Sequence, residues 1–215
     1  LGVLAPGKLA DIAVVEGKLE DMNVSDVFLG GELAAQDRKL LLDLPEYQYP
    51  DTVKHSVKRS HITPEDLELK TDKEKVKANC IGLILDQNPT DAFTEELKSE
   101  NGIVQPDIDR DILPIANVGR HGQSDIGSGF VKGFGMKHGA FAESVAHDTH
   151  NIIVVGTNYN DMAEAVNHVI DMQGGLALVK DGQVIGDLPL RIGGLMTDEM
   201  SAGELTKRMD ELTGL

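Results

Sequence analysis

The chain has 215 residues, of which 40% are hydrophobic and 4% aromatic, and its formal net charge is −16. This hydrophobic fraction predicts a packed core of aliphatic side chains and argues against a disordered chain. The negative charge argues against a nucleic-acid partner, because it repels phosphate backbones.

The cysteine content and the hydropathy pattern limit the possible disulfides, metal sites and cellular location. Cys80 is the single cysteine, which excludes an intrachain disulfide and a zinc site built from cysteines. It lies in the apolar run 80–85, so we expect a buried thiol in a reducing compartment, the cytoplasm. No apolar stretch approaches the roughly 20 residues that a membrane span needs, and we see no secretory signal, so we expect no membrane partner.

Residues 1–45 predict a small β unit, with Gly30-Gly31 as a tight turn between two of its strands. Strands this short and few do not make a stable sheet alone, so we expect strands from elsewhere to complete it. Leu1 opens the chain in place of Met and Leu215 directly follows a helical pattern, so we interpret the sequence as a piece of a longer protein. The expected strands are residues 10–15, 24–29 and 32–35.

A polar connector with two prolines, residues 45–50, marks the predicted domain boundary. Beyond it, Thr63 followed by Pro64 is typical of the start of a short helix. A glycine-rich loop is expected over 119–127, at the end of an apolar run. The expected strands of this part are residues 53–59, 75–85, 111–118 and 151–156.

The last third of the chain predicts two helices and a hairpin. Asn160 and Asp161 are expected to cap a helix with one apolar face, which Gly174-Gly175 ends. Asp181-Gly182 predicts a hairpin between residues 176–179 and 184–188. A capping box of Ser201 and Glu204 predicts a final helix over 201–212.

The elements interleave without a strict βαβ rhythm, which predicts an α+β fold. We expect a partial small β-sandwich segment at residues 1–45 and a layered C-terminal domain with a mixed sheet at residues 51–215.

The first candidate site is the cluster His147, Asp148, His150 and Asn151. Imidazole and carboxylate side chains are metal ligands, so two His and one Asp could supply three of them. The same residues could instead line a substrate pocket or orient a partner loop. A third interpretation is structural: these side chains hydrogen-bond backbone at the entry to the strand 151–156.

The second candidate is Arg120-His121 in the glycine-rich loop 119–127. Arg120 could bind an anion or stack on a planar base, and a flexible solvated loop is the alternative. We expect this loop and the segment 147–151 to lie close together, because both border apolar strands.

Common catalytic patterns are absent from the sequence. There is no Ser-His-Asp elbow, no credible catalytic setting for the single cysteine, and no H-x-E…P-C-x-x-C signature of the cytidine-type zinc deaminases. The spacing of the glycines matches neither GxGxxG after a strand nor GxxxxGK[ST]. The residues by themselves therefore hold no complete recognised catalytic set.

Long segments of the chain nevertheless resemble one family. The opening residues 2–15 look like the segment that, in amidohydrolases, leaves the catalytic barrel and enters a small β-sandwich. Further motifs resemble, in order and spacing, the C-terminal region of the adenine deaminases of the amidohydrolase superfamily. These motifs are residues 111–116, 129–135, 144–156, 161–167 and 188–196.

This resemblance implies hydrolysis of adenine to hypoxanthine and ammonia by a metal-activated hydroxide. In the family, a divalent metal (manganese, iron or zinc) lies in a (β/α)₈ barrel. The region that resembles this chain follows that barrel, and the sequence given does not include it. The resemblance thus implies adenine as the substrate and the barrel domain as a missing partner, with no metal and no catalytic residue in this chain. It also implies a homo-oligomer, and little activity for the isolated chain.

Two other interpretations stay open. The chain could be a non-catalytic binding or assembly module that folds alone. It could also be the equivalent region of another amidohydrolase, such as a dihydroorotase-like or imidazolonepropionase-like enzyme, although the motifs within 129–196 argue against this.

Overall fold

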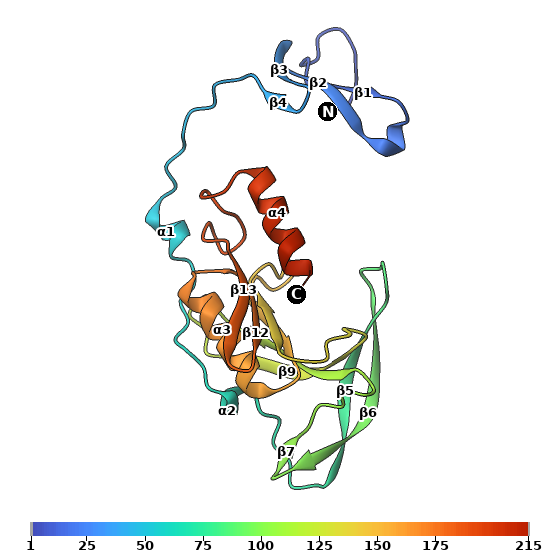
Figure 1. Ribbon diagram of the computed structural model, residues 1–215, viewed down its shortest axis with the longest axis vertical. Helices are drawn as coiled ribbons and strands as arrows, with labels where there is room; N and C mark the ends of the chain where they lie inside the picture. The colour runs from blue at the N-terminus through green and yellow to red at the C-terminus, as the bar shows by residue number, and fades with distance from the viewer. Residues whose placement is uncertain (1, 215) are drawn as a thin grey trace. The chain divides into compact units, whose positions relative to one another are not determined.

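A computed structural model describes residues 2–214, which divide into two compact units, one up to Gln48 and one from Tyr49 onward (Figure 1). Both units are built on mainly antiparallel sheets, and the α-helices among the described residues belong to the larger unit. The fold is therefore α+β, as the sequence predicted.

The smaller unit is an antiparallel sheet with the strand order β1-β2-β3-β4. Ala34 is the one buried side chain among its described residues. Large apolar side chains such as Val14, Leu29 and Leu40 stay 40%, 50% and 57% exposed, so this sheet encloses almost no core. The elements are β1 (Ile12–Glu16), a 3₁₀ turn (Leu19–Asp21), β2 (Asn23–Leu29), β3 (Glu32–Gln36) and β4 (Lys39–Leu40).

The larger unit is built on one sheet with the strand order β13-β12-β10-β11-β8-β9-β5-β6-β7 among the described residues. All neighbours pair antiparallel except β5 and β9, which run parallel. The strands are β5 (Lys75–Leu83), β6 (Thr90–Glu100), β7 (Ile103–Val104), β8 (Ile112–Val118), β9 (Ile126–Lys132), β10 (Ala140–Glu143), β11 (Ile152–Gly156), β12 (Gly175–Lys180) and β13 (Gln183–Pro189). The helices are α1 (Asp51–Lys54), α2 (Pro64–Leu67), α3 (Tyr159–Asp171) and α4 (Ala202–Thr213).

Helix α3 covers one face of this sheet over β10, β11 and β12 (Figure 1). The predicted apolar face of α3 packs in the main core against side chains such as Ala142 and Val154. The helix begins earlier than predicted, because Asn158 is the cap and its Oδ1 accepts from the Asp161 N–H at 2.8 Å. At the same end, the Tyr159 hydroxyl donates to the Val104 carbonyl at 3.0 Å, and burial raises the pKa of Tyr159 to about 12.

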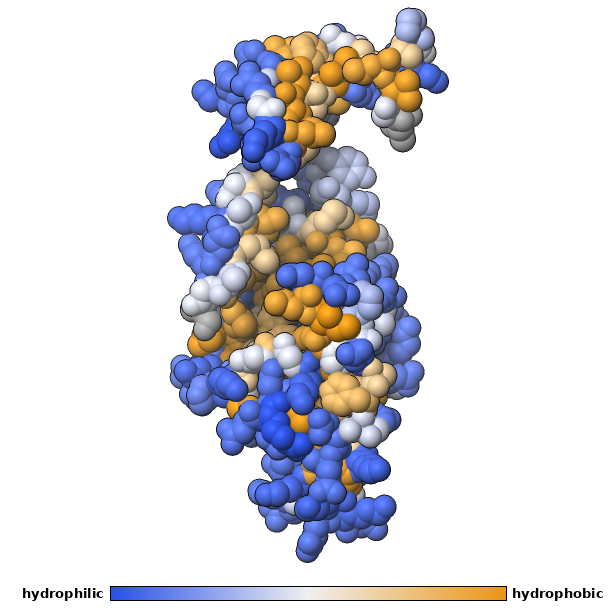
Figure 2. Space-filling model, turned by 90° about the vertical axis from the view of Figure 1, so that its right-hand side faces the viewer, coloured by the Kyte–Doolittle hydropathy of each residue, from blue (hydrophilic) through white to orange (hydrophobic). Residues whose placement is uncertain are grey.

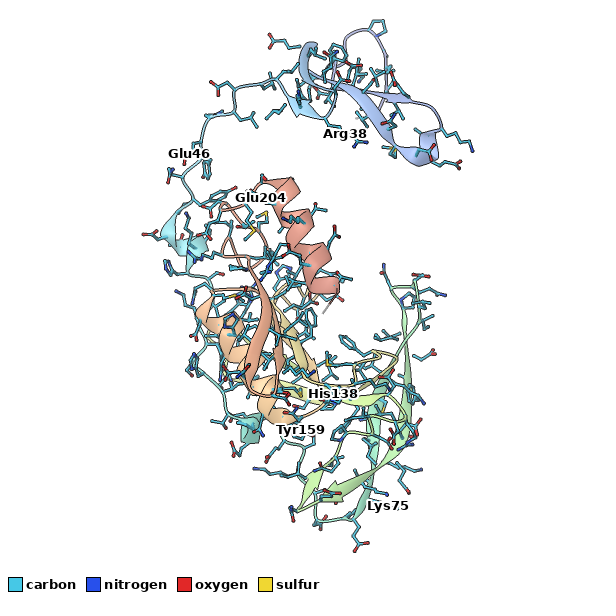
Figure 3. All side chains as sticks on the ribbon, in the orientation of Figure 1. Arg38, Glu46, Lys75, His138, Tyr159 and Glu204 are labelled. Carbon is cyan, nitrogen blue, oxygen red and sulfur yellow. The ribbon has the colours of Figure 1, made fainter. Side chains whose placement is uncertain are left out.

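Helix α4 packs on the opposite face, at the β12–β13 end of the sheet, where its Leu212 clusters with Leu176 and Leu188. The predicted capping box is confirmed, since Ser201 and Glu204 exchange hydrogen bonds in the first turn, where Figure 3 labels Glu204. Within residues 2–214, no helix is long and apolar enough to cross a membrane.

Several local predictions are also confirmed. Thr63 caps α2 in a capping box with Asp66. Asp181-Gly182 forms the two-residue turn between β12 and β13, with positive φ at both positions. Cys80 is 3% exposed, and this burial raises the pKa of its thiol.

The strand predicted over 53–59 is wrong. Its start belongs to the short helix α1, and the residues after it make single hydrogen bonds instead of a strand ladder; the Lys58 N–H, for example, donates to the Arg120 carbonyl at 2.7 Å. The Val57 N–H donates to Gln173 Oε1, and the Ile62 N–H just beyond donates to Asn167 Oδ1. Amide side chains in and just after α3, together with the Arg120 carbonyl, thus take the place of a neighbouring strand.

Five strands were not predicted, namely β4, β6, β7, β9 and β10. In β6, only Ala92, Phe93 and Leu97 are apolar, so its composition did not indicate a strand. Because β9 already begins at Ile126, the predicted loop 119–127 is shorter and ends at Asp125.

Candidate functional site

Arg120 lies two residues after the end of β8 and is 1% exposed. Its Nε donates to the His150 carbonyl at 2.6 Å, and its two terminal nitrogens donate to Ser56 Oγ at 3.3 Å and to the Gly193 carbonyl at 3.0 Å. Burial lowers the pKa of the guanidinium. No carboxylate forms an ion pair with Arg120 within residues 2–214, so backbone and hydroxyl oxygens alone satisfy it.

Glycine at position 194 makes room for this guanidinium. A Cβ at Gly194 would lie 2.6 Å from an Arg120 terminal nitrogen, and the backbone there has φ +73°. Ser144 Oγ donates to the Gly194 carbonyl at 2.6 Å and accepts from the Gly175 N–H at 2.8 Å. Arg120 with Ser56, His150 and Gly193 is called the Arg120 clasp below; it ties four distant parts of the chain together.

His150 contributes to the clasp through its backbone. Its carbonyl also accepts from His121 Nε2 at 2.8 Å, in the tautomer that protonates that nitrogen. His150 has φ +52°, its N–H donates to the Ala146 carbonyl at 2.7 Å, and its side chain is exposed. The loop 119–125 and the segment 147–151 therefore lie in contact, as expected.

The other predicted residues stand apart from the clasp. The side chains of His147 and Asp148 are 90% and 88% exposed, with 3.5 Å between His147 Nε2 and Asp148 Oδ1. The Asn151 N–H donates to Thr149 Oγ1 at 3.4 Å in a local turn. No group of three or more His, Cys, Asp or Glu side chains that could hold a metal ion occurs in the described part of the chain.

A hollow of about 500 Å³ lies on the sheet face opposite α3, over β5, β8, β9 and β11. Figure 2 shows hydrophobic residues gathered in a depression on this side of the larger unit. Gly127 and Gly129 leave the part of its floor formed by β9 without side chains, beside Ile115 and Ile153. The full lining is Asn79, Cys80, Ile81, Ala92, Phe93, Ile115, Ala116, Asn117, Gly127, Ser128, Gly129, Phe130 and Ile153.

Two polar side chains on this face were missed by the sequence reasoning. Asn117 lines the hollow, and its Oδ1 is buried without a hydrogen-bond partner. Glu143 is half-buried, and burial raises the pKa of its carboxyl. The sequence signal was the single glutamate that ends the otherwise uncharged run 139–143, shortly before the His147 cluster.

Comparison with known proteins shows which family and which relatives the chain is similar to. The family described as adenine deaminase C-terminal domain matches residues 87–215. Adenine deaminase 1 of Carboxydothermus hydrogenoformans is 53% identical over 213 residues, which are 99% of this chain and 35% of the relative. An adenine deaminase of Desulforamulus reducens is 42% identical over 214 residues, which are 99% of this chain and 36% of the relative.

An adenine deaminase of Clostridium botulinum is 40% identical over 215 residues, which are 98% of this chain and 36% of the relative. The chain thus spans about a third of the length of the curated relatives it matches.

Proposed function

This chain belongs to the adenine deaminase C-terminal domain family, and from that premise we propose that it works as the C-terminal portion of an adenine deaminase. Such an enzyme hydrolyses adenine to hypoxanthine and ammonia, in purine salvage in the cytoplasm. The observation that carries the proposal is the match over nearly the whole chain, at 53% identity to adenine deaminase 1 of Carboxydothermus hydrogenoformans.

In this proposal the chemistry is completed by protein outside these 215 residues. A divalent metal, manganese, iron or zinc, activates water when bound, and we assign it to a barrel domain in the longer enzyme. The described residues lack three clustered ligands, so no step of the reaction is assigned to a metal on this chain.

In the proposal, the candidate residues of this chain lie at the entrance to the active-site pocket of the barrel domain. The Arg120 clasp fixes the loop that carries His121 and the segment that carries His147, Asp148 and Asn151. The exposed side chains of that segment are free to face the substrate side of a barrel. Their proposed role is to cover and orient, because the His150 carbonyl holds His121 Nε2 in place while the His147 and Asp148 side chains stay almost fully exposed.

The smaller unit has a separate proposed role, as part of an amidohydrolase-type β-sandwich over residues 1–45. Figure 2 shows hydrophobic residues across its surface, and a second sheet over them would supply the missing core. In hydrogen exchange, β1 to β3 of this chain should then exchange fast, and the same strands should become protected in the longer enzyme. Fast exchange in both would contradict the sandwich.

A chimera tests the proposed function. This chain replaces the matching third of the Carboxydothermus enzyme, and ammonia release from adenine is measured with added manganese, iron or zinc. We expect the chimera to turn over adenine and the 215-residue chain alone to release no ammonia above blank. A folded chimera without turnover would favour a non-catalytic assembly module, and gel filtration of the same sample tests the proposed homo-oligomer.

A further inference from the structure

One part of the larger sheet is left uncovered by the described residues. On the face opposite α3, helix α4 covers the β12–β13 end, and Met136 packs against Leu113 and Val131 at one end of β8 and β9. The part between these two covers contains the hollow and is called the open sheet face below; Figure 2 shows it as an apolar depression. Its residues include Ile81, Ile115, Asn117, Gly127, Glu143 and Ile153.

The register of the strands places one row of these residues on the same face. Ile153 pairs with Glu143 on one side and with Asn117 on the other, and Asn117 in turn pairs with Gly127. Directly paired residues of antiparallel strands point to the same face. Val154, the neighbour of Ile153, packs in the core that contains α3, so the row faces away from that helix.

The floor of the open sheet face is apolar and has a gap in it. Ile115 and Ile153 are half-buried, and Ile81 at the edge of the hollow is 42% exposed. Gly127 and Gly129 have no side chains, which leaves the hollow of about 500 Å³ between these residues. Protein interiors are close-packed, so a space of this size accepts large apolar side chains from a surface laid over it.

Two polar groups on the same face also lack partners. Asn117 Oδ1 is buried without a hydrogen bond, and the Glu143 carboxyl has no hydrogen bond or ion pair within residues 2–214. Buried polar groups are normally paired, because leaving them unpaired costs free energy. A covering surface that presents an N–H donor to Asn117 and a donor or cation to Glu143 would satisfy both groups.

Polar loops border this apolar floor. β8 ends one residue after Asn117 and leads to the loop 119–125, and β10 ends at Glu143 and leads to the segment 147–151. The side chains of His147 and Asp148 in that segment are almost fully exposed. An apolar centre with a polar, solvent-exposed border is the usual arrangement of a protein interface.

We propose that the open sheet face is the surface on which the rest of the longer enzyme packs, with a large apolar side chain in the hollow over Gly127 and hydrogen-bond donors opposite Asn117 and Glu143. The inference rests on the proposed function and deepens it, because it names the face by which this domain joins its partner. The loops 119–125 and 147–151 then lie at the border of that interface.

The length of the relatives and the charge of the chain favour this partner. The 213 residues matched in the Carboxydothermus relative are 35% of its length, so most of that protein remains to supply the covering surface. A second copy of this chain is less suited, because two chains of net charge −16 repel each other.

Thiol labelling measures whether the open sheet face is covered in the longer enzyme. Gly127→Cys places a thiol in the hollow, because Gly127 is exposed, lies outside the left-handed region and has open space around an added Cβ. A maleimide reagent is added to this variant as the 215-residue chain and as the chimera described above, and the label at residue 127 is counted by peptide mass. We expect labelling to be at least about tenfold slower in the chimera than in the chain alone.

Glu164→Cys, on the exposed side of α3, is the matched control. Its labelling rates in the chimera and in the chain alone should agree within about twofold, because that side belongs to the other face of the sheet. The native Cys80 is 3% exposed and should react slowly in both proteins.

Two charge substitutions test the apolar contact. Ile81→Glu places a carboxylate at the edge of the hollow, whereas Val184→Glu places one on the other face, since Val184 pairs with Val179 of the core that contains α3. Ile81 and Val184 are 42% and 37% exposed, so each change should shift the midpoint of thermal unfolding of the 215-residue chain by at most about 3 °C. We expect Ile81→Glu to reduce the labelling difference between chimera and chain alone at least about threefold, and Val184→Glu to leave it unchanged.

Equal labelling of Gly127→Cys in the chimera and in the chain alone would overturn the proposal, and so would an equal slowing of Glu164→Cys. Protection in the chain alone that disappears on dilution would assign the face to a second copy, which also overturns it. Equal effects of Ile81→Glu and Val184→Glu would contradict the apolar contact in the hollow.

The labelling result is independent of turnover, so the proposed packing and the proposed function can fail separately. An active chimera with an accessible Gly127→Cys thiol would reject the packing and keep the function. A protected thiol in an inactive chimera would keep the packing and reject the function.

Discussion

The Arg120 Nε and the His150 carbonyl oxygen lie 2.6 Å apart, and this hydrogen bond joins two loops that are 30 positions apart in the sequence. The guanidinium is buried without a carboxylate, so it stabilises the fold only while its oxygen acceptors stay in place. These two loops are held together by backbone oxygens, and the side chains of the segment 147–151 remain available for other contacts.

Gly194→Ala should damage the clasp by a direct clash. Its Cβ would meet the Arg120 guanidinium at 2.6 Å, and φ is +73°. Gly193→Ala is the matched control, because Gly193 also has positive φ, +64°, but open space around the added carbon. We expect Gly193→Ala to lower the free energy of unfolding by about 1 kcal/mol and Gly194→Ala by about 2 kcal/mol more, in urea denaturation. Equal losses would show that the clasp tolerates the added methyl group.

His150→Ala should leave the clasp intact, because the backbone carbonyl supplies the hydrogen bonds. We expect the free energy of unfolding to stay within about 0.5 kcal/mol of wild type. His150→Gly should raise it by up to about 1 kcal/mol, because glycine adopts φ +52° without strain. A loss above about 2 kcal/mol in His150→Ala would assign the imidazole a structural role that its exposure does not suggest.

The sequence predicted the elements whose signals are local. The turn at Asp181-Gly182, the helix start at Thr63-Pro64 and the capping box at Ser201 depend on residues within four positions of each other. The strand β11 was predicted from its apolar run. Each of these signals needs no knowledge of the rest of the chain.

What the sequence could not show depends on distant partners. The stretch 53–59 has strand-like composition, yet Gln173 takes its Val57 N–H. The role of His150 was expected in its side chain and lies in its carbonyl. The half-buried position of Glu143 could be recognised only from the pairing of β10 with β11 and β12, because strand pairing decides on which face of the sheet a side chain lies.

Asp161→Ala should destabilise the β12–β13 hairpin. Asp161 is 3% exposed, and its carboxylate accepts from the N–H groups of Asp181 at 3.2 Å and Gly182 at 2.8 Å. Removing a charged acceptor leaves those donors unpaired, so we expect a loss of about 2–3 kcal/mol in the free energy of unfolding. Glu164→Ala, at an exposed position on the same helix, should change it by about 0.5 kcal/mol at most. Similar losses in the two variants would contradict a specific role of Asp161.

Glu143 should make the stability of the chain depend on pH. Burial raises the folded-state pKa of its carboxyl above the ordinary value of 4.5, whereas the unfolded chain keeps that ordinary value. The folded state therefore holds a proton that the unfolded state releases. The contribution of Glu143 is complete below pH 4.5 and is lost as the pH rises through the folded-state pKa. Above that pKa, folding must enclose a charged carboxylate without a partner.

Glu143→Gln has no proton to lose, so its free energy of unfolding relative to wild type should increase from acidic to neutral pH and then level off. Urea denaturation of both proteins across this range measures the difference. Glu164→Gln, on the exposed side of α3, controls for the removal of one negative charge from a chain of net charge −16. If this difference in the free energy of unfolding shrinks with rising pH, Glu143 has a cationic partner in solution. Its carboxylate would then not be unpaired on the open sheet face.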